Sequence, residues 1–315
     1  MSDPIAVFAQ KTYPSVTALV ERVARVKGLD SLGDAEGLLS DGSIAIDDAF
    51  LARAPKLRVI ALSSVGYDKV DVEACARRGI PFSNAHGALT DAVADVCFAL
   101  VLAAMRKLTA SLDWARSGSW MSGPAPFGND LAGKTLGIIG FGEIGAALAR
   151  RAQVSRMTVV YSNRTQRADD AVLGTRFLSF DELLATADCI VSLVPLSPQT
   201  RKMFGAAQFS RMKQGARFVN AGRGALVDSE ALLAALESGK LGGAALDVTD
   251  PEPLPQGHPL YSAPNVTIFP HIGSATPETR ERMALLAAEN LVAGLRGEPM
   301  PTLVKTSAGK TQTLS

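Results

Sequence analysis

The chain has 315 residues, of which 47% are hydrophobic and 20% are charged, and its formal net charge is +1. This composition excludes a chain that is disordered throughout, and the near-neutral charge gives no support for a nucleic-acid or anionic-membrane ligand. At roughly 150 residues per domain, the length favours two domains.

The N-terminal part of the chain alternates short apolar runs with helical patterns. Strands are predicted over Ile5–Ala9, Arg58–Ser64 and Pro81–Asn84, and helices over Ser15–Val26 and Asp71–Arg78. This alternation is typical of a parallel sheet that is covered by helices.

A longer helix is predicted over about Thr90–Trp114, and a loop rich in Gly, Pro and Ser follows over Ser117–Asp130. The nearly uncharged part of this helix, Val96–Met105, is about half as long as the ~20 residues that a membrane span needs. Because Thr90 and Asp91 stand before it as helix-capping residues, this part is predicted to be a buried helix.

A second alternating series begins at Lys134 and contains enough strands for a doubly wound sheet. Its predicted strands are Thr135–Ile139, Thr158–Tyr161, Cys189–Val194, Arg217–Asn220, Ala244–Val248 and Val266–Phe269. Its predicted helices include Ile144–Ala152, Asp181–Thr186 and Ser229–Ser238, and a last helix covers about Pro277–Leu295.

The three cysteines, Cys75, Cys97 and Cys189, are scattered and form no CxxC pair. Each lies among apolar residues, so each is interpreted as a packing residue. The N-terminus lacks the basic start, the long apolar stretch and the cleavage site of a secretory signal. A cytoplasmic protein is expected.

The sequence GFGEIG at 140–145 is a GxGxxG motif that follows a predicted strand and opens a predicted helix. Glycines here permit a tight turn, close approach of a pyrophosphate and close packing of helix on strand. The helix N-terminus adds free N–H groups for the phosphates. The motif predicts dinucleotide binding, although one of its residues is acidic; the predicted contacts are Gly140, Gly142, Glu143, Ile144 and Gly145.

This motif completes the predicted architecture, which is α/β with two doubly wound parallel-sheet domains. The dinucleotide-binding series starts late and a helix remains after it, so the simplest arrangement inserts one domain into the other. A Rossmann cofactor domain over 100–282 is predicted inside a flavodoxin-like substrate domain over 1–99 and 283–315.

The end of the next strand decides which dinucleotide binds. NAD sites carry Asp or Glu about 20 residues past the glycines, where it accepts from the ribose 2′-OH. This chain has Asn163, Arg164 and Thr165 there, and an Arg can pair with a 2′-phosphate that no carboxylate repels. NADPH is therefore predicted as the preferred cofactor, although NAD stays possible. These three residues are predicted cofactor contacts. The alternative interpretation of Arg164 is a solvated arginine in a loop.

Three later strand ends supply candidate catalytic groups: Arg223 in NAGRG, Glu252 in DVTDPEP and His271 in PHIGS. In open α/β sheets such ends share the edge that binds ligands. Arg can bind a planar carboxylate through two parallel hydrogen bonds, and a His beside a carboxylate suits proton transfer near neutral pH. No serine lies in a GxSxG and no cluster has metal-ligand spacing, which argues against a hydrolase or a metalloenzyme.

Together these residues resemble the D-2-hydroxyacid dehydrogenase family of NAD(P)-dependent two-domain enzymes. The resemblance covers roughly Arg58 to Pro301 and includes VGYDKVD, ALTDAVAD, VPLSPQT, NAGRG, DVTDPEP and PHIGSAT in order. DVTDPEPLP, PHIGSAT and LRGEPMP are most similar to the glyoxylate/hydroxypyruvate reductases of that family. The chain departs from the family pattern at Glu143, His86 and Ser155, where Arg, Pro and Gly are usual.

The resemblance implies roles for matching residues. Arg223 would bind the substrate carboxylate and carbonyl, His271 would donate the proton, and Glu252 would orient His271. The N–H groups of Val65 and Gly66 would bind the carboxylate from the other domain. Cofactor contacts are implied for Thr90, Pro195, Thr200, Ala221, Asp247 and Gly273.

The implied function is reduction of glyoxylate or hydroxypyruvate to the D-2-hydroxy acid with hydride from NADPH. The family is mostly dimeric, so a homodimer is expected, with the Trp120–Phe127 loop in the contact. Two alternatives stay open: an NAD-dependent biosynthetic dehydrogenase, such as a phosphoglycerate dehydrogenase without its regulatory domain, and a non-catalytic dinucleotide-sensing protein like the related corepressors.

Overall fold

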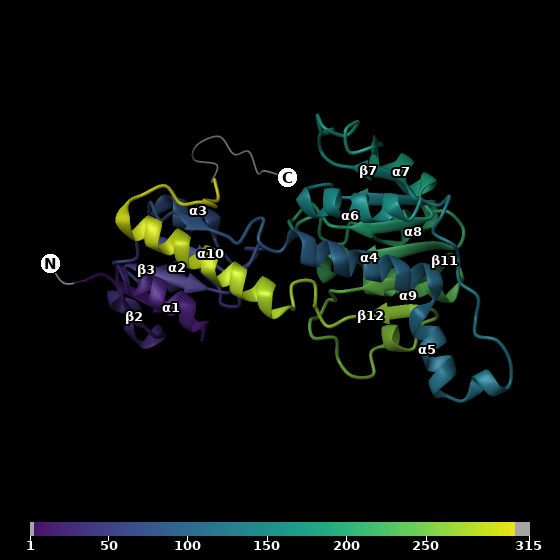
Figure 1. Ribbon diagram of the computed structural model, residues 1–315, viewed down its shortest axis with the longest axis horizontal. Coiled ribbons are helices and arrows are strands. Elements are labelled where there is room, and N and C mark those ends of the chain that lie inside the picture. The colour runs from purple at the N-terminus through teal and green to yellow at the C-terminus, as the bar shows by residue number, and fades with distance from the viewer. Residues whose placement is uncertain (1–2, 306–315) are drawn as a thin grey trace. The chain divides into compact units, whose positions relative to one another are not determined.

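The computed structural model describes residues 3–305. Within this range the chain forms two compact units, one from 3–89 with 275–305 and one from 90–274 (Figure 1). The first boundary lies earlier in the chain than the predicted one because helix α4 (Thr90–Arg106) packs on the sheet of the second unit. The second boundary also lies earlier, because helix α10 (Pro277–Arg296) packs on the sheet of the first unit. The last ten residues of the predicted substrate domain, 306–315, lie outside the described residues.

The first unit contains a five-stranded sheet in the order β2-β1-β3-β4-β5, all of whose strand pairs are parallel. This is the flavodoxin-like order. The strands are β1 (Ile5–Phe8), β2 (Arg25–Lys27), β3 (Gly37–Ser40), β4 (Val59–Leu62) and β5 (Phe82–Ser83). The helices are α1 (Pro14–Val20), α2 (Asp48–Ala52), α3 (Val72–Arg77) and α10 (Pro277–Arg296), with a 3₁₀ turn at Leu29–Asp34.

Three elements of this unit were not predicted from the sequence: β2, β3 and α2. The predicted Ser15–Val26 helix is wrong in its last part, because α1 ends at Val20 and Val26 instead pairs with Ala6 in the sheet. Two of the three residues of β2 are charged, and the five residues of α2 are too few to show a helical period.

Two glycines let α10 approach the first sheet closely. A Cβ at Gly37 would press on the Leu291 side chain, and one at Gly294 would press on Val59. The helix therefore buries its apolar side, including Leu291 and Leu295, against β3 and β4. This contact joins the C-terminal part of the chain to the N-terminal sheet.

The second unit contains a seven-stranded parallel sheet in the order β12-β11-β10-β9-β6-β7-β8. The strands are β6 (Thr135–Ile139), β7 (Thr158–Ser162), β8 (Arg176–Phe177), β9 (Cys189–Ser192), β10 (Ala216–Asn220), β11 (Leu241–Leu246) and β12 (Val266–Ile268). All six predicted strands are present with ends shifted by a few residues, and β8 is additional. Chain order reverses between β6 and β9, which is where such sheets bind nucleotides.

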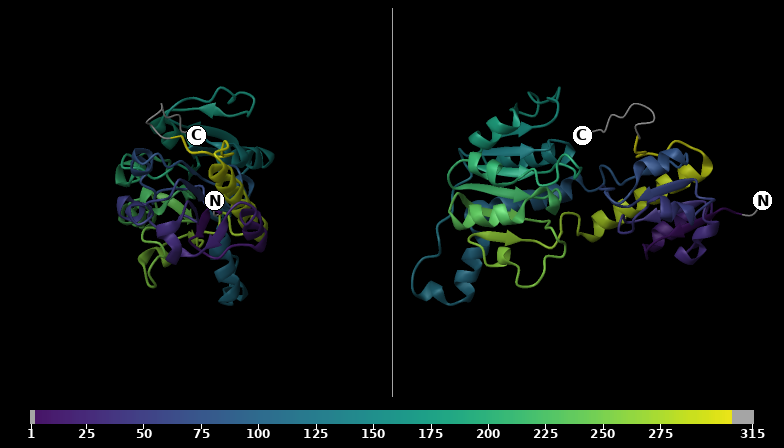
Figure 2. Two further views of the ribbon diagram at one scale, coloured as in Figure 1. Left: turned by 90° about the vertical axis from the view of Figure 1, so that its left-hand side faces the viewer. Right: turned by 180° about the vertical axis from the view of Figure 1, so that it is seen from behind.

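Helices cover both faces of this sheet (Figures 1 and 2). On one face α4 and α6 (Glu143–Val154) form an apolar core with the strands. On the other face lie α7 (Phe180–Thr186), α8 (Ala206–Arg211) and α9 (Ser229–Glu237). Gly137, in the middle of β6, leaves room that the Leu183 side chain of α7 fills.

The predicted long helix Thr90–Trp114 is wrong as a single element. It is divided into α4 and α5 (Leu108–Arg116) by Lys107, whose φ of 52° is left-handed and cannot continue an α-helix. The predicted loop after it holds a short 3₁₀ turn at Ser119–Met121. Among the described residues, no helix combines the length and apolar character that crossing a bilayer requires.

The interpretation of the cysteines as packing residues is confirmed. Cys75, Cys97 and Cys189 are all buried and free. Burial raises the pKa of Cys75 to about 11 and those of Cys97 and Cys189 to about 12, so the thiols stay protonated near neutral pH.

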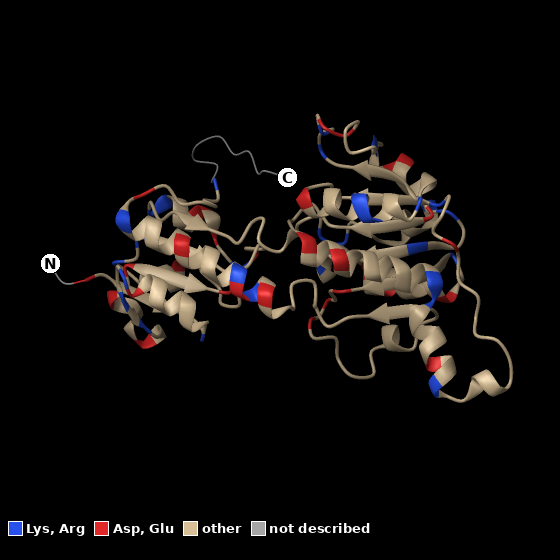
Figure 3. Ribbon diagram, in the orientation of Figure 1, with Lys and Arg blue, Asp and Glu red and all other residues tan. Residues whose placement is uncertain are grey.

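Charged residues of both signs are interspersed along each unit (Figure 3).

Candidate active site

Five loops of the second unit leave the carboxyl ends of parallel strands and so meet at one edge of its sheet. They follow β6, β9, β10, β11 and β12, and they carry the glycine motif and the predicted catalytic residues. Arg223 comes after β10, Glu252 after β11 and His271 after β12, three strands that are neighbours in the sheet. The predicted convergence on one edge is therefore present in the fold.

Glu252 and His271 form a direct pair, with His271 Nδ1 2.7 Å from Glu252 Oε1. A carboxylate only accepts hydrogen bonds, so Nδ1 carries the proton and Nε2 is the nitrogen left for a reactant. The His271 side chain is 47% exposed and the Glu252 side chain is 41% exposed. The pair can therefore present a histidine nitrogen to a small molecule while Glu252 fixes the ring.

Asp247 holds the turn that carries His271. Its backbone carbonyl accepts from His271 N at 2.8 Å, and its carboxylate accepts from Ile272 N at 2.8 Å and Gly273 N at 3.0 Å. Asp247 is itself buried, and a Cβ on Gly273 would come within 3.1 Å of its Oδ2. The resemblance implies that Asp247 and Gly273 contact the cofactor; here their first role is to shape this turn.

The turn keeps His271 in an uncommon backbone conformation. Its φ of 54° lies in the left-handed region, which costs energy for a residue with a Cβ. The three hydrogen bonds to Asp247 are the contacts that hold it there. Such strain at a side chain with catalytic chemistry is typical of functional sites.

The side chain of Asn220 shapes the loop that carries Arg223. Asn220 Nδ2 donates to the Arg223 carbonyl at 2.8 Å, and its Oδ1 accepts from Gly222 N at 3.2 Å. The guanidinium turns back on its own loop, with Nη1 2.8 Å from the Gly222 carbonyl. Asn220 is buried at the strand end, and it was not among the site residues predicted from the sequence.

Gly224 brings the Arg223 loop against the Glu252 loop. A Cβ at this position would collide with the backbone of Thr249 and Asp250. Only glycine permits that approach. The Arg223 and Glu252 loops are thus packed backbone to backbone, although they are separated in sequence by a whole helix and strand.

The glycine loop has the shape that a dinucleotide requires. Gly140 has a φ of 89°, and a Cβ there would lie 2.7 Å from Val194 N. Gly142 is the N-cap of α6 and no side chain caps this helix end. First-turn N–H groups are therefore available for phosphates. The residues present fit a nicotinamide dinucleotide.

Asn163 fastens this loop to the end of β7. Its Oδ1 accepts from Phe141 N at 2.6 Å, and its Nδ2 donates to the Phe141 carbonyl at 3.1 Å. The buried Phe141 ring stacks on Tyr161 with 4.4 Å between centroids. The amide of Asn163, a predicted cofactor contact, is thus committed to the loop, while Arg164 and Thr165 beside it are exposed.

Arg167, which was not among the residues predicted for the site, lies over the glycine loop. Its guanidinium is 5.8 Å from the Phe141 ring centroid, and it pairs with Asp169 at 2.7 Å. The hydrogen bond to Asp169 raises the pKa of Arg167. Asp169 therefore neutralises this arginine, whereas no acid stands directly after β7, where an NAD site has one.

The acidic residue of the motif lies in the first turn of α6. Glu143 Oε2 accepts from Thr90 Oγ1 at 3.3 Å. A carboxylate is favoured at a helix N-terminus, so Glu143 suits this position in α6, although the phosphates expected beside it also carry negative charge. Thr90, another predicted cofactor contact, is thereby placed next to the glycine loop.

The remaining predicted contacts are distributed over both units. Thr200 Oγ1 donates to the Pro195 carbonyl at 2.8 Å and so closes the loop after β9, and Ala221 follows β10. Val65 and Gly66 follow β4 in the first unit. Their carbonyls accept from Asn84 Nδ2 and Ser64 Oγ, each at 2.8 Å, but neither N–H donates to another described residue.

The comparisons with known proteins agree with this geometry. A family model described as D-isomer specific 2-hydroxyacid dehydrogenase, NAD binding domain, matches residues 98–273. A glyoxylate/hydroxypyruvate reductase B of Yersinia enterocolitica is 46% identical over 273 residues, 85% of this chain and 83% of the relative. A glyoxylate reductase of Korarchaeum cryptofilum is 42% identical over 301 residues, 94% of this chain and 88% of the relative.

A solved structure is also similar. The NADPH-dependent glyoxylate/hydroxypyruvate reductase of Sinorhizobium meliloti, crystallised with NADP and malonate, matches with a TM-score of 0.86 and 32% sequence identity. The match covers 96% of this chain and 97% of that one. At this coverage the likeness includes both units of the fold.

The role of Asp247 can be tested with Asp247→Asn. An amide accepts through one atom only, so either Ile272 N or Gly273 N loses its partner in a buried turn, at a cost of about 1–3 kcal/mol. We expect the thermal midpoint, measured by scanning calorimetry, to fall by several degrees. Asp130→Asn removes an exposed carboxylate of the same unit and should leave the midpoint unchanged; equal midpoints for the two variants would contradict the role.

Proposed function

The chain belongs to the D-isomer specific 2-hydroxyacid dehydrogenase family, and from that premise we propose that it reduces glyoxylate or hydroxypyruvate to the D-2-hydroxy acid with NADPH. The observation that carries this proposal is the Glu252–His271 pair at the sheet edge that also bears the glycine loop and Arg223. The names of the relatives support the substrate class.

Three residues of the chain have different roles in this reduction. NADPH, when bound, supplies hydride to the carbonyl carbon of the keto acid. His271 donates the proton that the developing alkoxide takes up, and Glu252 holds the ring and stabilises its charged form. Arg223 binds the carboxylate and stabilises the negative charge that forms on the neighbouring oxygen.

The role of His271 predicts a large loss of turnover. His271→Ala should lower kcat for glyoxylate about 10²–10⁴-fold, the usual contribution of a positioned general acid. Glu252→Gln keeps the shape of the pair but no longer stabilises the protonated ring, so the pH profile of reduction should move to lower pH. Initial rates of NADPH oxidation across pH measure both effects, with circular dichroism as the control for folding.

An unchanged pH profile in Glu252→Gln would remove that residue from the mechanism. Wild-type chain that binds NADPH but turns over neither keto acid would favour the dinucleotide-sensing alternative. Efficient turnover with NADH alone would favour the biosynthetic dehydrogenase.

Arg223 is predicted to bind the substrate carboxylate through its planar fork. Arg223→Lys keeps the charge but loses the two-point contact. We expect kcat/KM for the keto acid to fall at least about tenfold, which corresponds to roughly 1.4 kcal/mol of transition-state stabilisation. A fluorescence titration should find NADPH affinity little changed; a collapse of NADPH binding instead would assign Arg223 to the cofactor.

We also propose that NADPH is preferred over NADH because of Arg164. The residue is exposed just after β7, where the chain has no acid that would repel a 2′-phosphate. A charge-assisted bond to the 2′-phosphate contributes about 1.5–3 kcal/mol. In Arg164→Ala the ratio of kcat/KM for NADPH to that for NADH should fall about tenfold or more, and in Arg150→Ala, an exposed arginine of α6, it should not change.

A homodimer is the proposed assembly, with the segment after α5 in the contact. Trp120, Met121 and Phe127 are 74%, 92% and 84% exposed, an unusual gathering of large apolar side chains on a loop. Wild-type chain should have the mass of a dimer by light scattering, and Trp120→Ser combined with Phe127→Ser should shift it towards the monomer. A monomeric wild type would overturn the proposal.

A cytoplasmic location is proposed as well. All three cysteines are buried and unbonded, which fits a reducing compartment.

A further inference from the structure

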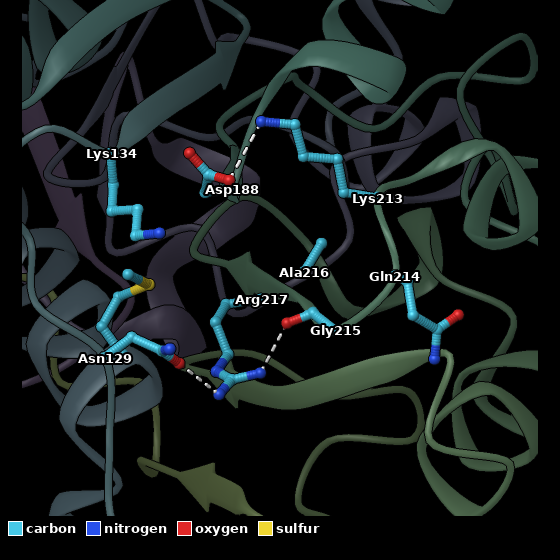
Figure 4. Close-up of a pocket in the computed structure, with 9 residues that line it drawn as sticks. Asn129, Lys134, Asp188, Lys213, Gln214, Gly215, Ala216 and Arg217 are labelled. Atoms are coloured by element: carbon cyan, nitrogen blue, oxygen red, sulfur yellow. Dashed lines mark hydrogen bonds and ion pairs between the residues drawn. The ribbon is translucent and has the colours of Figure 1, made fainter.

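A polar cavity lies at the edge of the second unit's sheet that is opposite to the candidate active site, and we refer to it as the amino-edge cavity (Figure 4). Its volume is about 120 Å³, well above the 10–15 Å³ that one water molecule requires. The polar side chains that line it are Asn129, Lys134, Asp188, Lys213, Gln214 and Arg217. They precede or begin β6, β9 and β10, so the cavity is at the other end of these strands from the catalytic residues.

Arg217 is the centre of this cavity. Only 6% of the residue is exposed, and its guanidinium donates to the Ala104 carbonyl at 3.0 Å, the Gly215 carbonyl at 2.6 Å and Asn129 Oδ1 at 2.8 Å. These bonds use three of the five N–H groups that a guanidinium has. Within residues 3–305 no carboxylate pairs with it.

The neighbouring strand leaves room for the buried guanidinium of Arg217. A Cβ at Gly242, on the neighbouring strand β11, would overlap Arg217 Nη1. Burial lowers the pKa of Arg217, as expected for a charge held in low dielectric without a counter-charge. Buried charges in proteins are normally paired, so an arginine placed in this way indicates that its counter-charge comes from outside the chain.

The other charged residues of the amino-edge cavity leave a positive surplus. Asp188 already accepts from Lys213 Nζ at 3.0 Å and from Thr135 N at 2.8 Å. Burial acts to raise the pKa of Asp188, but Thr135 N–H, Lys213 and Lys134 lower it overall, so Asp188 is ionised. The ammonium group of Lys134 makes no hydrogen bond or ion pair within the described part of the chain, and only the backbone of this residue is bonded.

We propose that the amino-edge cavity binds a small dianionic oxyanion of the phosphate class. Three cations face one carboxylate there, and a dianion balances the surplus. Arg217 offers the remaining N–H groups of its planar fork, and Lys134 adds a mobile ammonium group. The bound anion would join the end of α4, through Ala104 and Arg217, to the turn before β10.

Calorimetric titration of inorganic phosphate tests the proposal. The full chain is first saturated with NADPH, so that the glycine loop is occupied, and ionic strength is held constant with NaCl. We expect one further phosphate to bind and to raise the thermal midpoint. In Lys134→Gln the affinity should fall at least about tenfold, while a fluorescence titration finds NADPH affinity unchanged.

Matched variants separate the site from general charge effects. Lys11→Gln removes an exposed lysine of the first unit and should leave phosphate binding unchanged. Arg217→Lys keeps the charge but not the fork, and if it folds it should also weaken binding. Methyl phosphate is titrated in parallel: binding as tight as phosphate identifies a phosphomonoester as the ligand, and much weaker binding identifies the free ion.

No phosphate binding to the NADPH-loaded chain, or equal affinity in wild type and Lys134→Gln, would overturn the proposal. Arg217 would then be a structural tie between α4 and β10. Because the measurement is heat of binding and not turnover, its outcome does not depend on which keto acid, if any, the chain reduces.

Discussion

The candidate active site depends on one buried carboxylate. Asp247 accepts three backbone N–H groups from the turn after β12, one on its carbonyl and two on its side chain. Those bonds hold His271 at a positive φ, and from that conformation its ring reaches Glu252. The residue that we propose as the proton donor is therefore positioned by a neighbour to which we assign no part in the proton transfer.

The loops of the candidate site also have to approach one another backbone to backbone, which is the second constraint at this edge of the sheet. Gly224 lets the Arg223 loop lie on Thr249, and Gly140 lets the dinucleotide loop lie against Val194. Side chains at either position would push the loops apart, and the groups they carry would no longer share one edge. The glycines thus bring the functional loops together, and the polar side chains of Asn220 and Asn163 then fix each loop in shape.

The charged residues at the two edges of this sheet differ in burial and in pairing. At the carboxyl edge the Glu252–His271 pair is half exposed. At the amino edge Arg217 is buried, and Asp188 is already satisfied by Lys213 and a backbone N–H. Strand β10 connects the two, because it begins beside the amino-edge cavity and leads into the Arg223 loop.

The sequence by itself determined the parallel α/β architecture, the insertion of one unit into the other and the strand ends at which Arg223, Glu252 and His271 stand. These follow from periodicity and from glycine motifs, which are local signals. The tertiary structure alone decided that Asn163 and Asp247 hold loops, that Lys107 divides the long helix and that Arg217 lies in a cavity. Each of those depends on partners distant in sequence or on a single backbone angle, and no local pattern encodes which distant carbonyl or N–H a side chain will meet.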